Sequence, residues 1–249
     1  MTKDMDSIIN ITKENWGEEN PRSKIKIGDK IIYYIYSKDG DSTLKHELEM
    51  MDTARKNNIG VAEVYYYEKN GNLEICIMEY IKGRKAEISD TNRIMRELEK
   101  FKRIPEKEKG VFFNSIVLGP NSDEINSYNN ISDYISDQLD KLCEIRRIEK
   151  IPVKIPELSN KFSFSHGDIS LDNVIINNNK IYFIDWECAG YFPCELVGVL
   201  SLKDECFKKE EKNDDIGTII NIVKYLRIDK EKALSLIKQY KYEKSINKS

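Results

Sequence analysis

Three oxygen-bearing side chains at fixed spacing are the residues of this sequence best suited to chemistry. Asp168 lies in the turn-rich segment 165–173, and Asn173 follows it by five residues. Asp185 comes directly after residues 181–184, which have the composition of a β-strand. Phosphoryl transfer from a nucleoside triphosphate needs one carboxylate that orients the attacking hydroxyl and takes its proton. It also needs an amide oxygen and a second carboxylate that hold Mg²⁺. The pattern therefore predicts phosphoryl transfer.

The surroundings of the two aspartates favour this interpretation. The spacing from Asp168 to Asn173 equals that of the Asp and Asn in a kinase catalytic loop. Neither residue lies in an apolar periodic pattern, and a carboxylate at the end of a strand, such as Asp185, is costly to bury without a cation or donors. A single aspartate would more simply be a turn or cap residue, but the assembled block favours a functional role. For His166, a hydrogen bond to the nearby backbone is favoured over proton transfer.

Composition excludes several other classes of protein. The 249 residues suffice for one large domain or two lobes, and 40% hydrophobic with 33% charged residues is typical of a soluble globular protein. No apolar run is long enough for a membrane span, and the N-terminus carries acids, so we expect a cytoplasmic protein without membrane contact. A net charge of −3 speaks against nucleic-acid binding. Five scattered cysteines and two histidines make a zinc site improbable.

The first third of the chain is expected to be rich in strands. Residues 24–27 and 31–36 flank a turn at Gly28, and residues 61–67 and 73–78 flank the hairpin signal at Asn70 and Gly71. Between these hairpins, apolar residues recur at helical spacing over residues 44–56.

The chain after Gly83 is expected to be mostly helical. The predicted helices cover residues 89–102, 131–148, 216–226 and 230–242, with Asp229 as an N-cap, and a second hairpin joins 174–176 to 181–184. The expected fold class is α+β with two lobes. Residues 1–82 would form a nucleotide-binding lobe with an antiparallel sheet and one helix. Residues 83–249 would form a larger, mostly helical lobe for catalysis and acceptor binding.

The chemical block carries a family resemblance. Residues 165–173 followed by 183–193 resemble the aminoglycoside phosphotransferase and choline kinase superfamily, small-molecule phosphotransferases with a protein-kinase-like fold. Residues 77–83 resemble the linker between the lobes of that family, and residues 46–51 its small-lobe helix. These pieces occur in the family's order and span roughly residues 20 to 200.

The resemblance implies a role for each matching residue. Asp168 would be the catalytic base, and Asn173 and Asp185 would be ligands of Mg²⁺. The nucleotide would be ATP or GTP, with the Glu79 carbonyl and the Ile81 amide bonded to the purine edge and Met78 lining the pocket. Glu47 would be the helix carboxylate that normally holds the phosphate-binding lysine.

The sequence departs from the family pattern at that lysine. The family has it in the third strand, and residues 31–36 contain no basic residue. Lys38 follows two or more positions later, and Lys30 and Lys26 also lie in this hairpin. One of them could supply the charge from a displaced position, and Lys38 is our candidate. Without such a residue, Glu47 loses its usual partner.

The sequence leaves two functions from different classes. The first is transfer of the γ-phosphoryl group of ATP or GTP to a hydroxyl of a small molecule such as an aminoglycoside, choline, a sugar or an amino alcohol. Acidic residues in the C-terminal half, Glu187 among them, hint at a cationic acceptor.

The alternative is a catalytically degenerate kinase-fold module that binds nucleotide or a partner, which the missing lysine supports and the intact Asp168 opposes. A protein kinase is disfavoured because residues 187–200 are too short for an activation segment. The sequence does not distinguish a monomer from a homodimer.

Overall fold

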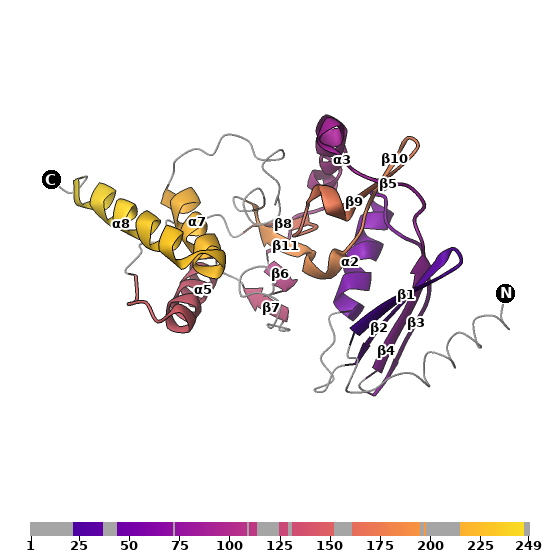
Figure 1. Ribbon diagram of the computed structural model, residues 1–249, viewed down its shortest axis with the longest axis horizontal. Coiled ribbons are helices and arrows are strands. Elements are labelled where there is room, and N and C mark those ends of the chain that lie inside the picture. The colour runs from indigo at the N-terminus through magenta and orange to yellow at the C-terminus, as the bar shows by residue number, and fades with distance from the viewer. Residues whose placement is uncertain are drawn as a thin grey trace.

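The computed structural model describes residues 22–36, 44–71, 73–108, 110–113, 125–128, 131–151, 161–194, 197 and 215–246. Antiparallel sheets and helices share the molecule, which makes it an α+β protein as predicted. Figure 1 shows the N-terminal sheet with helix α2 at one end of an elongated molecule, a cluster of helices α5, α7 and α8 at the other end, and small sheets between them.

The N-terminal sheet is four-stranded and antiparallel, in the order β1-β2-β4-β3. Its strands are β1 (Arg22–Ile27), β2 (Lys30–Tyr36), β3 (Val64–Asn70) and β4 (Leu73–Glu79). Gly28 and Gly71 turn the two hairpins with φ of 62° and 59°, a left-handed conformation that glycine adopts without strain. Both hairpins predicted for this part of the chain are confirmed.

Helix α2 (Leu44–Lys56) has the bounds that the apolar spacing predicts. Its N-terminal part packs on the sheet, where the fully buried Leu44 lies in one cluster with Cys76 of β4. Its C-terminal part contributes Met50, Met51 and Ala54 to the large core that also contains the C-terminal half of the chain. The helix therefore joins the N-terminal sheet to the rest of the molecule.

Two further sheets lie in the middle of the molecule. The first has the order β10-β9-β5, with β5 (Arg84–Lys85), β9 (Val174–Asn177) and β10 (Lys180–Phe183), and it contains the predicted second hairpin. The other has the order β7-β6-β11-β8, with β6 (Gly110–Phe113), β7 (Ile125–Tyr128), β8 (Phe162–Ser165) and β11 (Gly190–Pro193). The sequence did not predict this sheet, because each of its strands is four residues long and too short for a clear alternation.

The helical regions follow the prediction with one correction. Residues 89–102 are not one helix but η1 (Ile88–Asp90), α3 (Thr91–Leu98) and η2 (Phe101–Arg103). The Asp90 side chain accepts a hydrogen bond from the Glu87 backbone N–H, so it caps a first turn instead of lying within a helix. Two more single turns, η3 (Leu171–Asn173) and η4 (Trp186–Cys188), follow β8 and β10.

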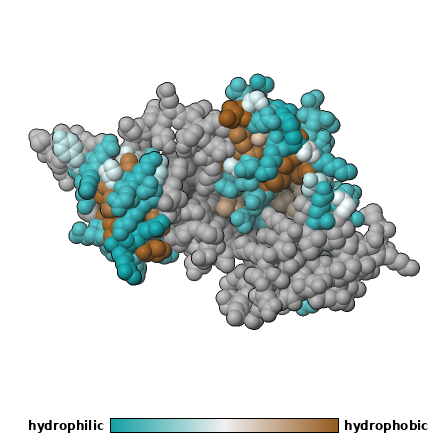
Figure 2. Space-filling view, viewed as in Figure 1, coloured by the Kyte–Doolittle hydropathy of each residue, from teal (hydrophilic) through white to brown (hydrophobic). Residues whose placement is uncertain are grey.

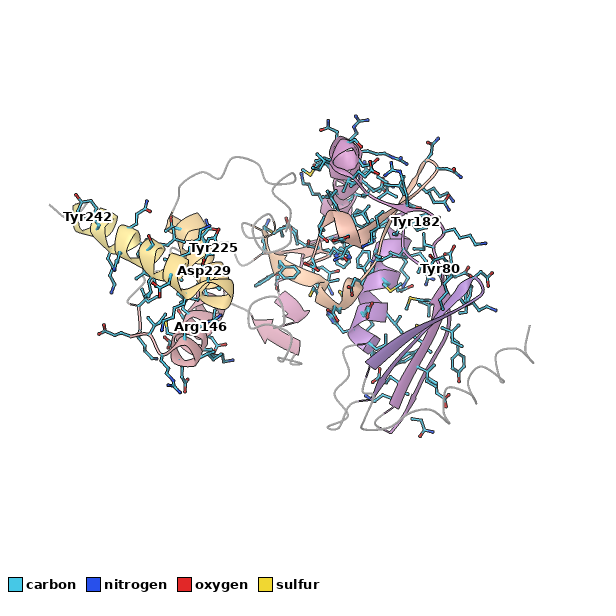
Figure 3. All side chains as sticks on the ribbon, in the orientation of Figure 1. Tyr80, Arg146, Tyr182, Tyr225, Asp229 and Tyr242 are labelled. Atoms are coloured by element: carbon cyan, nitrogen blue, oxygen red, sulfur yellow. The ribbon has the colours of Figure 1, made fainter. Side chains whose placement is uncertain are left out.

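The remaining helices are α5 (Ile131–Arg146), α7 (Asp215–Ile228) and α8 (Lys230–Ile246). Asp229 caps α8 as predicted, because its Oδ1 accepts a 3.0 Å hydrogen bond from the Lys232 N–H. Arg146, Tyr225 and Asp229 gather where α5 meets the corner between α7 and α8 (Figure 3), and Arg146 Nε donates to the Leu226 carbonyl over 2.6 Å. Among the described residues, no helix is long and apolar enough to cross a membrane.

An aromatic cluster forms the centre of the core. Phe101 stacks on Phe164 and Trp186, with ring centroids 5.8 and 6.1 Å apart, and meets Phe183 edge-on at 5.3 Å. All four rings are buried. Because Trp186 and Phe183 flank Asp185 in the sequence, this cluster anchors the chain on both sides of a predicted site residue.

The segment between α2 and β3 docks directly on β10. The Gly60 carbonyl accepts a 2.9 Å hydrogen bond from the Phe183 N–H. A Cβ atom built on Gly60 would lie 2.0 Å from the Ile181 carbonyl oxygen. The backbones meet too closely for any side chain at position 60, so glycine is required there by contact and not by its own dihedral angles.

We therefore predict that Gly60→Ala lowers the free energy of unfolding by about 2–3 kcal/mol, because the added methyl group forces α2 and β10 apart. Urea unfolding followed by circular dichroism measures this change. Gly71→Asn is the matched control, since a Cβ at this turn meets nothing within 4 Å and Asn tolerates a positive φ. An equal loss of stability in both variants would contradict the prediction.

Candidate functional site

The loop after β8 brings Asp168 and Asn173 into direct contact. The Asn173 Nδ2 donates hydrogen bonds to the backbone carbonyl and to the carboxylate Oδ2 of Asp168, each over 2.9 Å. The Asn173 N–H donates to the Ser170 carbonyl over 3.1 Å, which closes the turn η3. The five-residue spacing thus forms a compact loop in which each side chain fixes the other.

Ile184, the residue before Asp185, is hydrogen-bonded to both ends of this loop. The Ile184 N–H donates to the Asn173 carbonyl over 2.9 Å, and His166 Nε2 donates to the Ile184 carbonyl over 3.0 Å. Asp185 itself has φ 66° and ψ 64°, a left-handed conformation that turns the chain sharply at the end of β10. These contacts join the segments that carry the three residues predicted to do chemistry.

His166 is a structural residue of this loop. It is completely buried and meets the Trp186 ring edge-on, with centroids 4.6 Å apart. Burial lowers its pKa from 6.5 to about 4, against the opposing effects of the Ile184 carbonyl and the Asp185 charge. A neutral imidazole that donates to a backbone carbonyl fits the predicted backbone role and disfavours proton transfer.

His46 makes a contact that the sequence did not predict. It lies on α2 and is buried, and its Nε2 donates a 2.7 Å hydrogen bond to the Ala189 carbonyl, directly after η4. Burial lowers its pKa, so the ring is neutral. The helix that carries Glu47 is thereby fixed to the segment that follows Asp185.

Glu47 lies buried between α2 and the N-terminal sheet. Its charge, together with burial as the larger effect, raises the pKa of the Cys76 thiol to about 12. Cys76 of β4 is paired in register with Tyr33 of β2. The β2 residue in register with Cys76 is therefore a tyrosine, in line with the absence of a lysine from residues 31–36.

The two candidate lysines within the described hairpin lie at the linker end of the sheet. Lys30 is paired in register with Glu79, and Lys26 places its Nζ 3.5 Å from the centroid of the Tyr80 ring. This arrangement directs Lys26 toward an aromatic ring instead of toward Glu47. Lys38 lies outside the described residues.

The linker residues hold a defined path between the lobes. Tyr80 N–H donates to the Asp29 carbonyl over 2.7 Å, and Glu79 N–H donates to the Glu63 carbonyl over 2.8 Å. Met78 is half-buried against the core, and Ile81 is buried.

One face of the β9–β10 hairpin is only half-buried, which sequence reasoning did not predict. Val174, Ile176, Ile181 and Phe183 point into the core, whereas the paired Ile175 and Tyr182 are only half-buried on the opposite face. Tyr182 lies in the same region as Tyr80 of the linker (Figure 3). The sequence does not show which residues of β9 and β10 face the core, because both strands are almost uniformly apolar. Only the pairing of the two strands could have indicated it.

The two buried histidines make stability depend on pH. A pKa that is lower in the folded state means that the unfolded chain binds more protons, so the stabilisation is complete above pH 6.5 and is lost as the pH falls toward 4. We predict that the free energy of unfolding falls by about 2 kcal/mol between pH 6.5 and 5, where ordinary carboxylates remain ionised. Urea unfolding at each pH measures this slope.

His166→Gln removes the larger titrating group, so its unfolding free energy should depend less on pH over this range. His46→Gln tests the smaller contribution, because an amide N–H can still donate to Ala189 without titrating. An unchanged slope in both variants would mean that other groups cause the pH dependence.

Comparisons with known proteins bear on the fold and the family of the chain. A search of curated protein sequences gave no significant match. Among solved structures, the chain is similar to a protein from Haemophilus somnus 129PT assigned as a fructosamine-3-kinase, with 12% identity, a TM-score of 0.56, and 89% and 91% of the two chains covered. It is also similar to a thermostable mutant of aminoglycoside phosphotransferase APH(4)-Ia, with 14% identity, a TM-score of 0.51, and 91% and 90% covered. These likenesses confirm the predicted kinase-like fold. The model of the phosphotransferase enzyme family matches residues 12–195, and the chain belongs to that family.

Proposed function

We propose that this protein transfers the γ-phosphoryl group of ATP or GTP to a hydroxyl of a small molecule, with Mg²⁺ as cofactor. The observation that carries the proposal is the hydrogen-bonded loop of Asp168 and Asn173, joined through Ile184 to Asp185. Such catalysis consists of positioning and charge neutralisation, and both need polar groups on a rigid backbone. As the composition predicts, we expect the enzyme to act in the cytoplasm.

In this proposal Asp168 is the catalytic residue. Its carboxylate would orient the acceptor hydroxyl and take the proton as the oxygen attacks the γ-phosphorus. The hydrogen bond from Asn173 Nδ2 to Asp168 Oδ2 holds the carboxylate in one orientation, which reduces the entropy lost when the acceptor binds.

The residues present fit a magnesium ion. Because Asn173 Nδ2 donates to Asp168, the amide oxygen Oδ1 is the atom of this side chain that remains to bind a cation. Asp185 adds a carboxylate oxygen, and such hard oxygen ligands suit Mg²⁺. The bound ion would neutralise charge on the phosphates.

The nucleotide would lie between the linker and the half-buried face of the β9–β10 hairpin. The Glu79 carbonyl and the Ile81 N–H would bond the purine edge, and Met78, with Ile175 across from it, would enclose the ring. Glu47 and Lys38 would act on the phosphate side. This assignment keeps residues 1–82 as the nucleotide-binding lobe and residues 83–249 as the lobe that binds the acceptor.

For the acceptor we propose a small polyhydroxylated amine. The similar structures are named for a fructosamine and for an aminoglycoside, both of which combine hydroxyl groups with amino groups. A cationic acceptor also agrees with the acidic residues of the C-terminal half, such as Glu187. A degenerate module that binds nucleotide without turnover is the second candidate, favoured by the tyrosine at position 33.

We predict that Asp168→Asn lowers kcat at least about 100-fold while nucleotide affinity changes little, because the amide cannot accept the proton. Phosphate transfer from γ-labelled ATP and GTP to a panel of amino sugars, aminoglycosides, choline and sugars measures the activity. Asp172→Asn is the matched control, since this exposed aspartate lies in the same loop and forms only a surface ion pair with Lys85. It should retain full activity.

We also predict that Asp185→Asn weakens Mg²⁺-dependent binding of nucleotide by about tenfold or more, because a charged ligand of the metal is lost. Calorimetric titration with ATP, with and without Mg²⁺, measures this effect. Tight binding of Mg·nucleotide without turnover on any acceptor would favour the degenerate module. Binding that is unchanged in the variant would remove Asp185 from the metal site.

A further inference from the structure

A basic recess lies where the linker, α3 and the β9–β10 hairpin meet. It has a volume of about 400 Å³ and is lined by Lys82, Gly83, Arg84, Arg93 and residues 176–178. Three of these residues are cations, and none of the described lining residues carries a carboxylate. The surface over α3 and the β9–β10 hairpin is largely hydrophilic (Figure 2).

The backbone holds this recess in a fixed shape. Arg84 is paired in register with Ile176, and a Cβ on Gly83 would lie 2.5 Å from the Ile176 carbonyl oxygen. The linker at Gly83 therefore packs tightly on the backbone of Ile176 and the side chain of Ile175. Ile176 points into the core, and its neighbour Ile175 is half-buried on the opposite face of β9.

Two guanidinium groups are oriented before any ligand arrives. Arg84 donates from Nη1 and Nη2 to the two carboxylate oxygens of Asp90, over 2.6 and 2.9 Å, and Arg93 Nη2 donates to the Asn178 carbonyl over 3.2 Å. Lys82 makes no ion pair within the described part of the chain. The linker and α3 thus each contribute one guanidinium group that existing hydrogen bonds hold in place, and Lys82 adds an ammonium group.

The charges around the recess are not balanced. Three cations face one hydrogen-bonded carboxylate, that of Asp90, and the more distant Glu87 acts on Arg84 only through its charge. The two excess positive charges repel each other, and a doubly charged anion would offset them both. The available donors, an ammonium, guanidinium N–H groups and the amides of Asn177 and Asn178, match the oxygens of a tetrahedral anion.

We propose that this recess binds a phosphate group, either as free phosphate or as part of a small phosphorylated solute. The bound group lies between Lys82 of the linker, Arg93 of α3 and the turn of the β9–β10 hairpin. In that position the phosphate group contacts three elements of the fold. This proposal goes beyond the proposed function and does not depend on it.

The test is calorimetric titration of the full chain with inorganic phosphate, at constant ionic strength and with EDTA present. We expect saturable binding that weakens about tenfold in Lys82→Ala and in Arg93→Ala, because each variant loses one charge-assisted contact. Arg84 is left in place because it pairs with Asp90. Lys102→Ala is the matched control, since this exposed lysine pairs with Glu99 outside the recess, and it should bind phosphate as the wild type does.

A second titration with glycerol 3-phosphate identifies the source of the group. Tighter binding than that of inorganic phosphate, lost in the same two variants, supports a phosphorylated solute, and equal binding supports free phosphate. Absence of saturable binding overturns the proposal. Binding that is equal in the wild type, Lys82→Ala and Arg93→Ala overturns it too, because the phosphate would then bind elsewhere on the protein.

Discussion

The peptide groups on either side of one residue, Ile184, hold the candidate site together. The Ile184 N–H binds the carbonyl of Asn173, and its carbonyl accepts from His166, so both ends of the loop are fixed to the strand that ends at Asp185. Loss of a buried hydrogen bond of this kind costs about 1–3 kcal/mol. The segments that carry the predicted catalytic side chains are therefore placed by backbone contacts and by a buried neutral imidazole.

A second set of contacts fixes the small-lobe helix to the same strand. Gly60, just after α2, binds Phe183 on one side of Asp185, and His46 on α2 binds Ala189 on the other side. The two contacts bracket Asp185, and the aromatic cluster of Trp186 fills the space below. Since protein cores are close-packed and deform little, the position of Glu47 relative to Asp185 follows from these contacts.

Local signals in the sequence predicted much of this arrangement, but they did not predict the contacts between distant segments. Helix α2, the hairpins and the loop from Asp168 to Asn173 each follow from spacing or turn chemistry within a short window. The bond from His46 to Ala189 joins residues far apart in the chain, and nothing around either residue indicates the other. Gly60 carries no turn signal either, because its requirement comes from the Ile181 carbonyl of another element.

The missing strand lysine affects how charge must be neutralised in this protein. On the sheet face that packs against α2, the buried Glu74 of β4 pairs with Lys69 Nζ at 2.9 Å and accepts a 2.9 Å hydrogen bond from the Tyr67 hydroxyl. This cation comes from the edge strand β3 and balances Glu74, while the β2 residue in register with Cys76 is Tyr33. Residues 31–36 of β2 contain no lysine, so if the protein binds Mg·nucleotide as proposed, the metal would have to offset more of the charge on the triphosphate. Nucleotide binding should then depend more strongly on Asn173 and Asp185 than in a relative whose strand lysine shares that charge.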